Sequence, residues 1–159
     1  AGPAAIGLLA SEGLKRQVFV LEALLGAVER MKGELTLRLL PVPELLQSME
    51  KSSTPPVSEF FRRCGAGLGE LGEKSFAQIW RQAMEESEPE LEQAAKVAFE
   101  TLGEMLGQYR EEEQLAALER TTAELERALD AARREAEVRG KLDRILGLTA
   151  GAFLAIVLI

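Results

Sequence analysis

The side chains of this chain that could do chemistry are almost all carboxylates, and two dense groups stand out at 85–88 and 111–113. Two carboxylates can act as general acid and base when they share one site. Successive residues of a helix point about 100° apart, so neither group gathers its carboxylates into one site. We interpret both groups as solvated charge near helix ends and as candidate docking points for a basic partner protein, with these members: Glu85, Glu86, Glu88, Glu111, Glu112 and Glu113.

Other kinds of catalytic or metal site lack the side chains they need. The chain has no histidine, which removes the commonest general base and the commonest transition-metal ligand. Its single cysteine, Cys64, cannot form an internal disulfide and is consistent with a reducing compartment. Arg63 and Gly65 beside it could lower the pKa of the thiol, but we interpret Cys64 as a small residue packed on a helix. The aspartate and glycine spacing of a calcium loop is absent.

Nucleotide and nucleic-acid binding are also disfavoured. The glycines of 65–72 lack the strand–turn–helix setting of a phosphate-binding loop, and Glu73 stands before Lys74-Ser75 where such a loop needs glycine. Trp80 and Tyr109 are too isolated to form a stacking platform. With 26 acidic and 19 basic residues the formal net charge is -7, which does not suit a nucleic-acid surface. We therefore predict a protein that is not an enzyme and uses no cofactor, no metal and no small-molecule substrate.

The elements that position these residues are predicted to be helices. Apolar residues follow a 4-3 rhythm from Leu14 onward, which predicts one long helix over 11–39, about 40 Å in length. Pro41 and Pro43 end it, because proline disfavours a helical residue in front of it. A short helix is expected over 44–51, followed by a loop at 52–56 that is rich in serine and proline.

The segment 57–68 is predicted to start as a helix and to lose its helical structure at the glycines that begin with Gly65. Further helices are predicted over 76–84 and from Pro89 to near Gly107. The longest helix begins at Glu111 and carries a heptad seam of Leu115, Leu118, Thr122, Leu125, Leu129, Ala132 and Ala136. No segment shows a convincing strand pattern. The predicted fold class is all-α, with about six helices.

The last fifteen residues, 145–159, contain no charged, amide or imidazole side chain and are apolar on every face. A membrane span takes about 20 apolar residues, whereas fifteen reach about 22 Å. Snorkelling of Lys141 and Arg144 and a thinned bilayer would supply the remaining length. We predict a C-terminal transmembrane helix, the alternative being a buried helix of a soluble core. Its anchor residues are Ile145, Leu146, Leu148, Phe153, Leu154, Ile156, Val157, Leu158 and Ile159.

The first ten residues are also apolar, and we interpret them as the remnant of a truncated N-terminal membrane helix. The alternative is a tag remnant followed by an ordinary buried first turn. Basic residues flank both apolar ends: Lys15, Arg16, Arg139, Lys141 and Arg144. Because positive charge favours the cytoplasmic side, the bulk of the chain is predicted to be cytoplasmic. The expected division is a membrane remnant at 1–10, a cytoplasmic helical domain at 11–144 and a transmembrane helix at 145–159.

These expectations combine into an architecture. The long first and last helices, both rooted at the membrane, should pair antiparallel, and the short helices between them should cap the membrane-distal end. The alternative is a coiled coil that forms only with a partner through the heptad seam.

Several segments carry a family resemblance. They are Leu106-Gly107 with Gln114, the run 141–151 before the apolar tail, the helix 14–34 with the following turn 41–46, and Trp80. Together they resemble the stage III sporulation protein AB family of endospore-forming bacteria. The resemblance extends over most of the chain, and its specific parts are the two end segments. Arg110 departs from the family pattern, which has an aspartate shortly after the Leu-Gly pair.

The resemblance implies a cytoplasmic helical domain with a membrane helix at each end. Such a domain is similar to those of the inner-membrane platform protein of type II secretion and type IV pilus machines. It implies a scaffold in the secretion apparatus between mother cell and forespore, in the mother-cell membrane around the forespore. The implied partners are a cytoplasmic secretion-type ATPase (stage III sporulation protein AA), other membrane subunits of the channel, and the lipid bilayer. The alternative is a tail-anchored coiled-coil tether that self-associates through the 115–136 seam.

Overall fold

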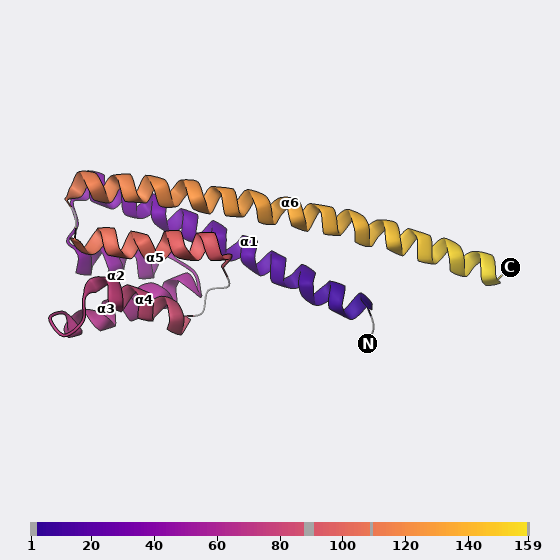
Figure 1. Ribbon diagram of the computed structural model, residues 1–159, viewed down its shortest axis with the longest axis horizontal. Helices are drawn as coiled ribbons and strands as arrows, with labels where there is room; N and C mark the ends of the chain where they lie inside the picture. Colours follow the sequence, from indigo (N-terminus) through magenta and orange to yellow (C-terminus); the bar gives the residue numbers. More distant parts are fainter. Residues whose placement is uncertain (1–2, 88–90, 109, 159) are drawn as a thin grey trace.

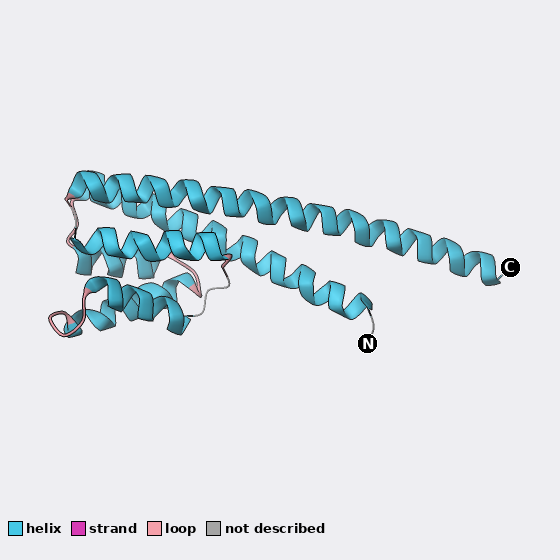
Figure 2. Ribbon diagram, in the orientation of Figure 1, coloured by secondary structure: helices cyan, strands magenta, loops and turns pink. Residues whose placement is uncertain are grey.

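The computed structural model describes the chain except for residues 1–2, 88–90, 109 and 159, and every regular element in the described part is a helix (Figure 2). The prediction of an all-α fold with about six helices is therefore confirmed. The elements are α1 (Pro3–Gly33), a π-helical segment η1 (Glu34–Arg38), α2 (Val42–Ser52), α3 (Val57–Gly67), a short 3-10 turn η2 (Leu68–Glu70), α4 (Phe76–Ser87), α5 (Gln93–Gln108) and α6 (Glu111–Leu158).

Successive helices run in opposite directions, so their connections gather at two ends of the molecule (Figure 1). The turns after α1, α3 and α5 lie together at the end farthest from the two chain termini, which we call the distal end. The turns after α2 and α4 lie toward the other end, from which the C-terminal half of α6 and the start of α1 project.

The long helices α1 and α6 pair antiparallel, as predicted. Arg133 donates to Glu22 at 2.8 Å, and Lys32 approaches Glu119 at 3.3 Å. Both ion pairs are exposed and add little stability, but they identify the register of the two helices. The heptad seam of α6 faces inward for most of its length. Its residues Leu118, Leu125, Leu129 and Ala132 are buried, and Leu115, Thr122 and Ala136 are partly buried.

The short helices occupy a different place from the predicted one. They do not sit as a cap beyond the end of the long pair but pack along its side, over the distal half (Figure 1). α5 lies along α6, α2 and α3 reach α1, and α4 packs between α3 and α5. Each short helix has one apolar stripe, and lying lengthwise against a neighbour buries far more of that stripe than an end-on contact would.

Trp80 lies at the centre of this side layer and is fully buried. Its ring meets those of Phe60 and Phe99 at centroid distances of 4.7 Å and 5.0 Å, and its indole N–H donates to the Phe99 carbonyl at 2.8 Å. Gly103 of α5 permits this close approach, because a Cβ there would lie 2.3 Å from Cγ of Trp80. The indole therefore joins α3, α4 and α5 into one core.

No helix in the described part of the chain is both long enough and apolar enough to cross a membrane. The prediction of a transmembrane helix at 145–159 is thus not supported, since charged residues stand directly before an apolar stretch that is short for a span. α6 continues without a break through 145–158, and its large apolar side chains there are exposed. Ile159 lies outside the described residues. Residues 3–10 form the first turns of α1, and the prediction that they are a membrane remnant stays a prediction, as does the division into three parts.

Candidate interaction surface

The structure separates the two acidic groups that were predicted as docking points. Glu111, Glu112 and Glu113 are exposed in the first turn of α6, at the distal end, where negative charge also favours the helix N-terminus. Glu85 and Glu86 are exposed near the C-terminal end of α4, which points away from the distal end. Glu88 lies outside the described residues. The two groups therefore lie at different ends of the helical layer, and their role as docking points stays a prediction.

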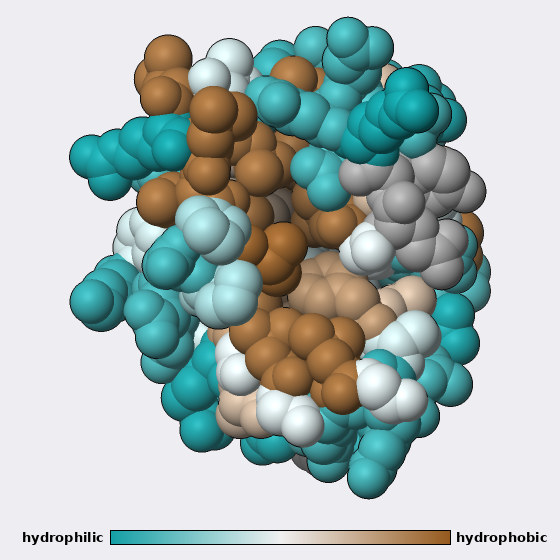
Figure 3. Space-filling model, turned by 90° about the vertical axis from the view of Figure 1, so that its left-hand side faces the viewer, coloured by the Kyte–Doolittle hydropathy of each residue, from teal (hydrophilic) through white to brown (hydrophobic). Residues whose placement is uncertain are grey.

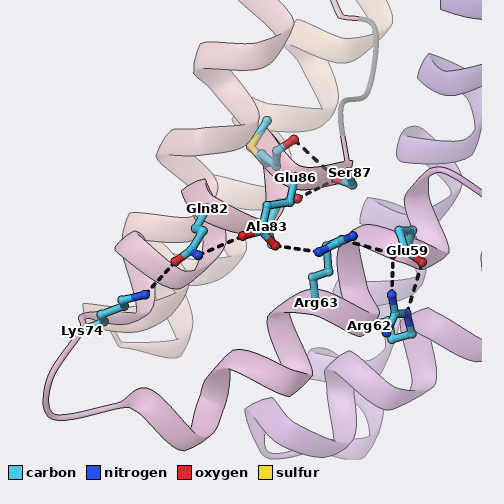
Figure 4. Close-up of polar contacts among 9 residues, drawn as sticks. Glu59, Arg62, Arg63, Lys74, Gln82, Ala83, Glu86 and Ser87 are labelled. Carbon is cyan, nitrogen blue, oxygen red and sulfur yellow. Dashed lines mark hydrogen bonds and ion pairs between the residues drawn. The ribbon is translucent and has the colours of Figure 1, made fainter.

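Glu86 is also engaged within the chain (Figure 4). It accepts hydrogen bonds from the Gln82 amide at 2.9 Å and from the Arg63 guanidinium at 2.7 Å. These two donors, Gln82 first, lower the pKa of the Glu86 carboxyl below its ordinary value. A carboxylate that holds α4 against α3 in this way is poorly placed to serve a partner.

The same contacts continue along a shallow groove of about 250 Å³ between α3 and α4. Arg62 hydrogen-bonds Glu59 and thereby lowers the pKa of that carboxyl, and Arg63 Nε lies 3.1 Å from Glu59. Beyond the groove, toward the distal end, Lys74 donates to Gln82 at 2.9 Å (Figure 4). Lys74 also pairs with Glu70, which lines the groove, at 3.2 Å. Each cation of the groove has a carboxylate neighbour, so the groove presents charges that are already balanced.

Cys64 is fully buried on α3, and burial raises the pKa of its thiol far above the ordinary value. The prediction that Cys64 is a small residue packed on a helix is therefore confirmed. Among the described residues no three acidic or cysteine side chains gather in a way that could hold a metal ion.

The distal end carries exposed leucines that the sequence analysis did not single out. We define the distal face as the three turns 34–41, 68–75 and 110–113. Leu37 is 85% exposed, Leu39 65% and Leu71 52%. Figure 3 shows this end of the molecule, with hydrophobic residues gathered in a band across it and hydrophilic residues around them.

A signal for these leucines was present in the sequence. Four leucines fall within 35–40, more than one helical stripe can bury. Leu35 is buried. The leucines that the stripe cannot bury fall in the wide turn of η1 and at Leu39, which has a left-handed backbone with a φ of 52°. Both features turn leucine side chains outward before Pro41 starts the next helix.

The basic residues predicted to flank the membrane lie away from the distal end, toward the projecting parts of α1 and α6. Because Glu22 pairs with Arg133, stepping seven residues along each antiparallel helix brings Lys15 level with Gly140. The structure thus brings the two basic groups, from α1 and α6, to the same level of the hairpin. Arg139 is partly buried and donates to Glu135 at 3.1 Å, and the remaining basic side chains are exposed: Lys15, Arg16, Lys141 and Arg144. The exposed apolar segment of α6 begins directly beyond them.

Comparisons with known proteins agree with this architecture. The family described as stage III sporulation protein AB has a sequence model that matches residues 1–159. A solved structure of stage III sporulation protein AB superposes with a TM-score of 0.69 at 19% sequence identity, over 77% of this chain and 97% of that one. Among curated proteins none matches the chain. The structural likeness concerns the fold, and the family description names a stage of sporulation and no reaction.

Proposed function

Because the chain belongs to the stage III sporulation protein AB family, we propose that it is a non-catalytic platform subunit of the secretion complex between mother cell and forespore. In this role it recruits a cytoplasmic secretion-type ATPase, stage III sporulation protein AA, and couples it to the membrane subunits of the channel. The contrast between the two ends of the molecule supports this proposal. One end is an exposed apolar helix with basic residues at its base, and the other is a folded helical layer.

The apolar end of α6 is the membrane-binding element of this proposal. From Ile145 to Leu158 its large apolar side chains are exposed around the helix, an arrangement that is unfavourable in water and favourable in lipid. Lys15, Arg16, Lys141 and Arg144 lie at its base, where cationic side chains are attracted to anionic headgroups. Under this proposal the protein is held at the mother-cell membrane around the forespore, with its helical layer in the cytoplasm.

The setting of the glycine-rich segment 65–72 supports the proposal that a partner protein, and not this chain, hydrolyses ATP. Its glycines lie at the end of α3, in η2 and in the following turn. Gly67 allows close packing of α3 against α4, because a Cβ there would lie 2.7 Å from a methyl carbon of Ile79. This segment follows a helix and not a strand, which is not the setting of a phosphate-binding loop. ATP hydrolysis is therefore assigned to the recruited ATPase.

Binding of the purified ATPase to the full chain tests the proposal. With the chain solubilised in mild detergent, we expect a specific complex at micromolar concentrations, as is usual for a transient machine contact of standard size. Circular dichroism on the same sample controls for folding. A folded chain that retains no ATPase would remove the coupling role.

A tail-anchored tether that self-associates through 115–136 is the second candidate, on the basis of the heptad seam. In the structure Leu118, Leu125 and Leu129 of that seam are buried within the chain, largely against α1 and α5. Two chains could pair through the seam only by opening this packing. Sedimentation of the same detergent sample separates the candidates: the platform gives one chain per micelle, and the tether gives a dimer or larger.

A further inference from the structure

We propose that the distal face is a docking surface for a partner that presents an apolar side chain surrounded by lysine and arginine. The inference rests on the platform role proposed above, and it specifies which surface the recruited ATPase binds and by what chemistry.

The first step is the apolar part of the face. Leu37, Leu39 and Leu71 come from two turns that are more than thirty residues apart in sequence, yet the fold brings both turns to one end. Each is more than half exposed, and hydrophobic residues form a band at this end (Figure 3). A gathered apolar patch with a polar rim is typical of a protein-binding surface, whereas isolated exposed leucines are ordinary.

The second step is the backbone that presents the leucines. Leu39 has a φ of 52°, in the left-handed region that residues with a side chain seldom adopt. It directly follows η1, a π-helical segment of five residues, a type of local irregularity that is frequent at functional sites. The chain thus holds an unfavourable local conformation with Leu37 and Leu39 in solvent.

The third step is the charge of the distal face, which determines the charge that a partner surface must carry. The three turns carry six glutamates against three basic residues. Two of the three basic residues are neutralised within the face, since Arg38 lies 3.8 Å from Glu34 and Lys74 lies 3.2 Å from Glu70. The remaining acidic residues form a negative rim: Glu73, Glu111, Glu112 and Glu113, all exposed. A basic surround on the partner complements this rim and speeds the encounter.

The same rim disfavours the other occupants of an apolar patch. A second copy docked face to face would set one acidic rim against another. An anionic membrane would repel the rim, and the membrane-binding end of α6 lies at the opposite end of the molecule. The groove of about 390 Å³ between α5 and α6 offers no comparable preference, because Arg120, Arg127 and Glu124 place both signs along it.

Binding of purified ATPase to full-chain variants tests the inference. The variant Leu37→Asp with Leu71→Asp should weaken binding by about tenfold or more, because it replaces two exposed leucines of the face with carboxylates. The matched control, Val97→Asp with Val138→Asp, changes two exposed apolar residues outside the face and should stay within about twofold. Glu112→Gln with Glu113→Gln should weaken binding at low salt and flatten its salt dependence. Circular dichroism and melting confirm that each variant is folded.

The outcomes separate this inference from the proposed function. If the ATPase binds the wild-type chain and the leucine variant equally well, the distal face is not the docking surface and the platform role stands. If the wild-type chain binds no ATPase, both are wrong. Self-association, or binding to anionic vesicles, that is lost in the leucine variant would identify a different occupant and overturn the inference.

Discussion

Replacing Trp80 with alanine is expected to lower the free energy of unfolding by about 3–5 kcal/mol. The side chain is fully buried, and its ring contacts Phe60 and Phe61 of α3, Phe99 of α5 and Phe76 of its own helix. Truncation leaves a cavity that these rings cannot fill without moving three helices. It also leaves the Phe99 carbonyl without the indole N–H that it accepts. Urea denaturation followed by circular dichroism measures the change, and a loss below about 1 kcal/mol would contradict this description of the core.

Two further substitutions control this result. Phe19→Ala removes an aromatic side chain that is more than half exposed on α1, so its effect should stay within about 0.5 kcal/mol. Gly103→Ala inserts a methyl group into the space that Trp80 fills and should cost about 1–3 kcal/mol. The same change at Gly65, where no atom lies within 4 Å of the added carbon, should instead gain about 0.5–1 kcal/mol. Opposite signs at two helical glycines would show that packing against Trp80, and not helix propensity, decides the outcome.

Placing charge on the apolar end of α6 is expected to abolish membrane binding. In Leu148→Asp with Phe153→Asp, two exposed apolar side chains that would enter lipid become carboxylates. Each lost side chain is worth about 2 kcal/mol of transfer free energy, so binding to vesicles should fall by about a thousandfold before the cost of the charges is added. Co-sedimentation with vesicles that contain anionic lipid measures the change.

Two further variants serve as controls for this prediction of membrane binding. Lys141→Gln with Arg144→Gln should weaken binding by about 1 kcal/mol per charge, on anionic vesicles and not on neutral ones. Leu37→Asp with Leu71→Asp, at the opposite end, should bind vesicles as the wild-type chain does. Unchanged vesicle binding by the Leu148 and Phe153 variant would show that this end of α6 is not the membrane-binding element.

The helices themselves could be predicted well because their signals are local. Pro41 and the loop predicted at 52–56 mark helix boundaries in the structure, and the seam from Leu115 onward identifies the buried side of α6. The largest error in an element lies at 57–68, whose glycines were expected to dissolve the helix. Gly65 and Gly67 remain within α3, because packing of this segment against α4 outweighs the low helix propensity of glycine.

The candidate surface could not be predicted in the same way, because it depends on which helix ends and turns the fold brings to the same end of the molecule. Five reversals of direction put the turn before α6 at the distal end and the end of α4 at the other, and no local pattern of the glutamates encodes that difference. Glu86 pairs with Arg63, which lies twenty-three residues earlier, so the sequence did not indicate that the charge of Glu86 is neutralised within the chain. Leu37, in contrast, was visible as an excess leucine and was taken as part of a regular helix.

The central proposal, that the chain joins a membrane at one end to an ATPase at the other, is tested most directly by recruitment of the purified ATPase to vesicles carrying the full chain. We expect the ATPase to float with these vesicles and not with bare ones. The Leu37→Asp, Leu71→Asp chain should stay on the vesicles without ATPase, and the Leu148→Asp, Phe153→Asp chain should bind ATPase in solution. An ATPase that stays in solution while the folded wild-type chain floats would contradict the proposal.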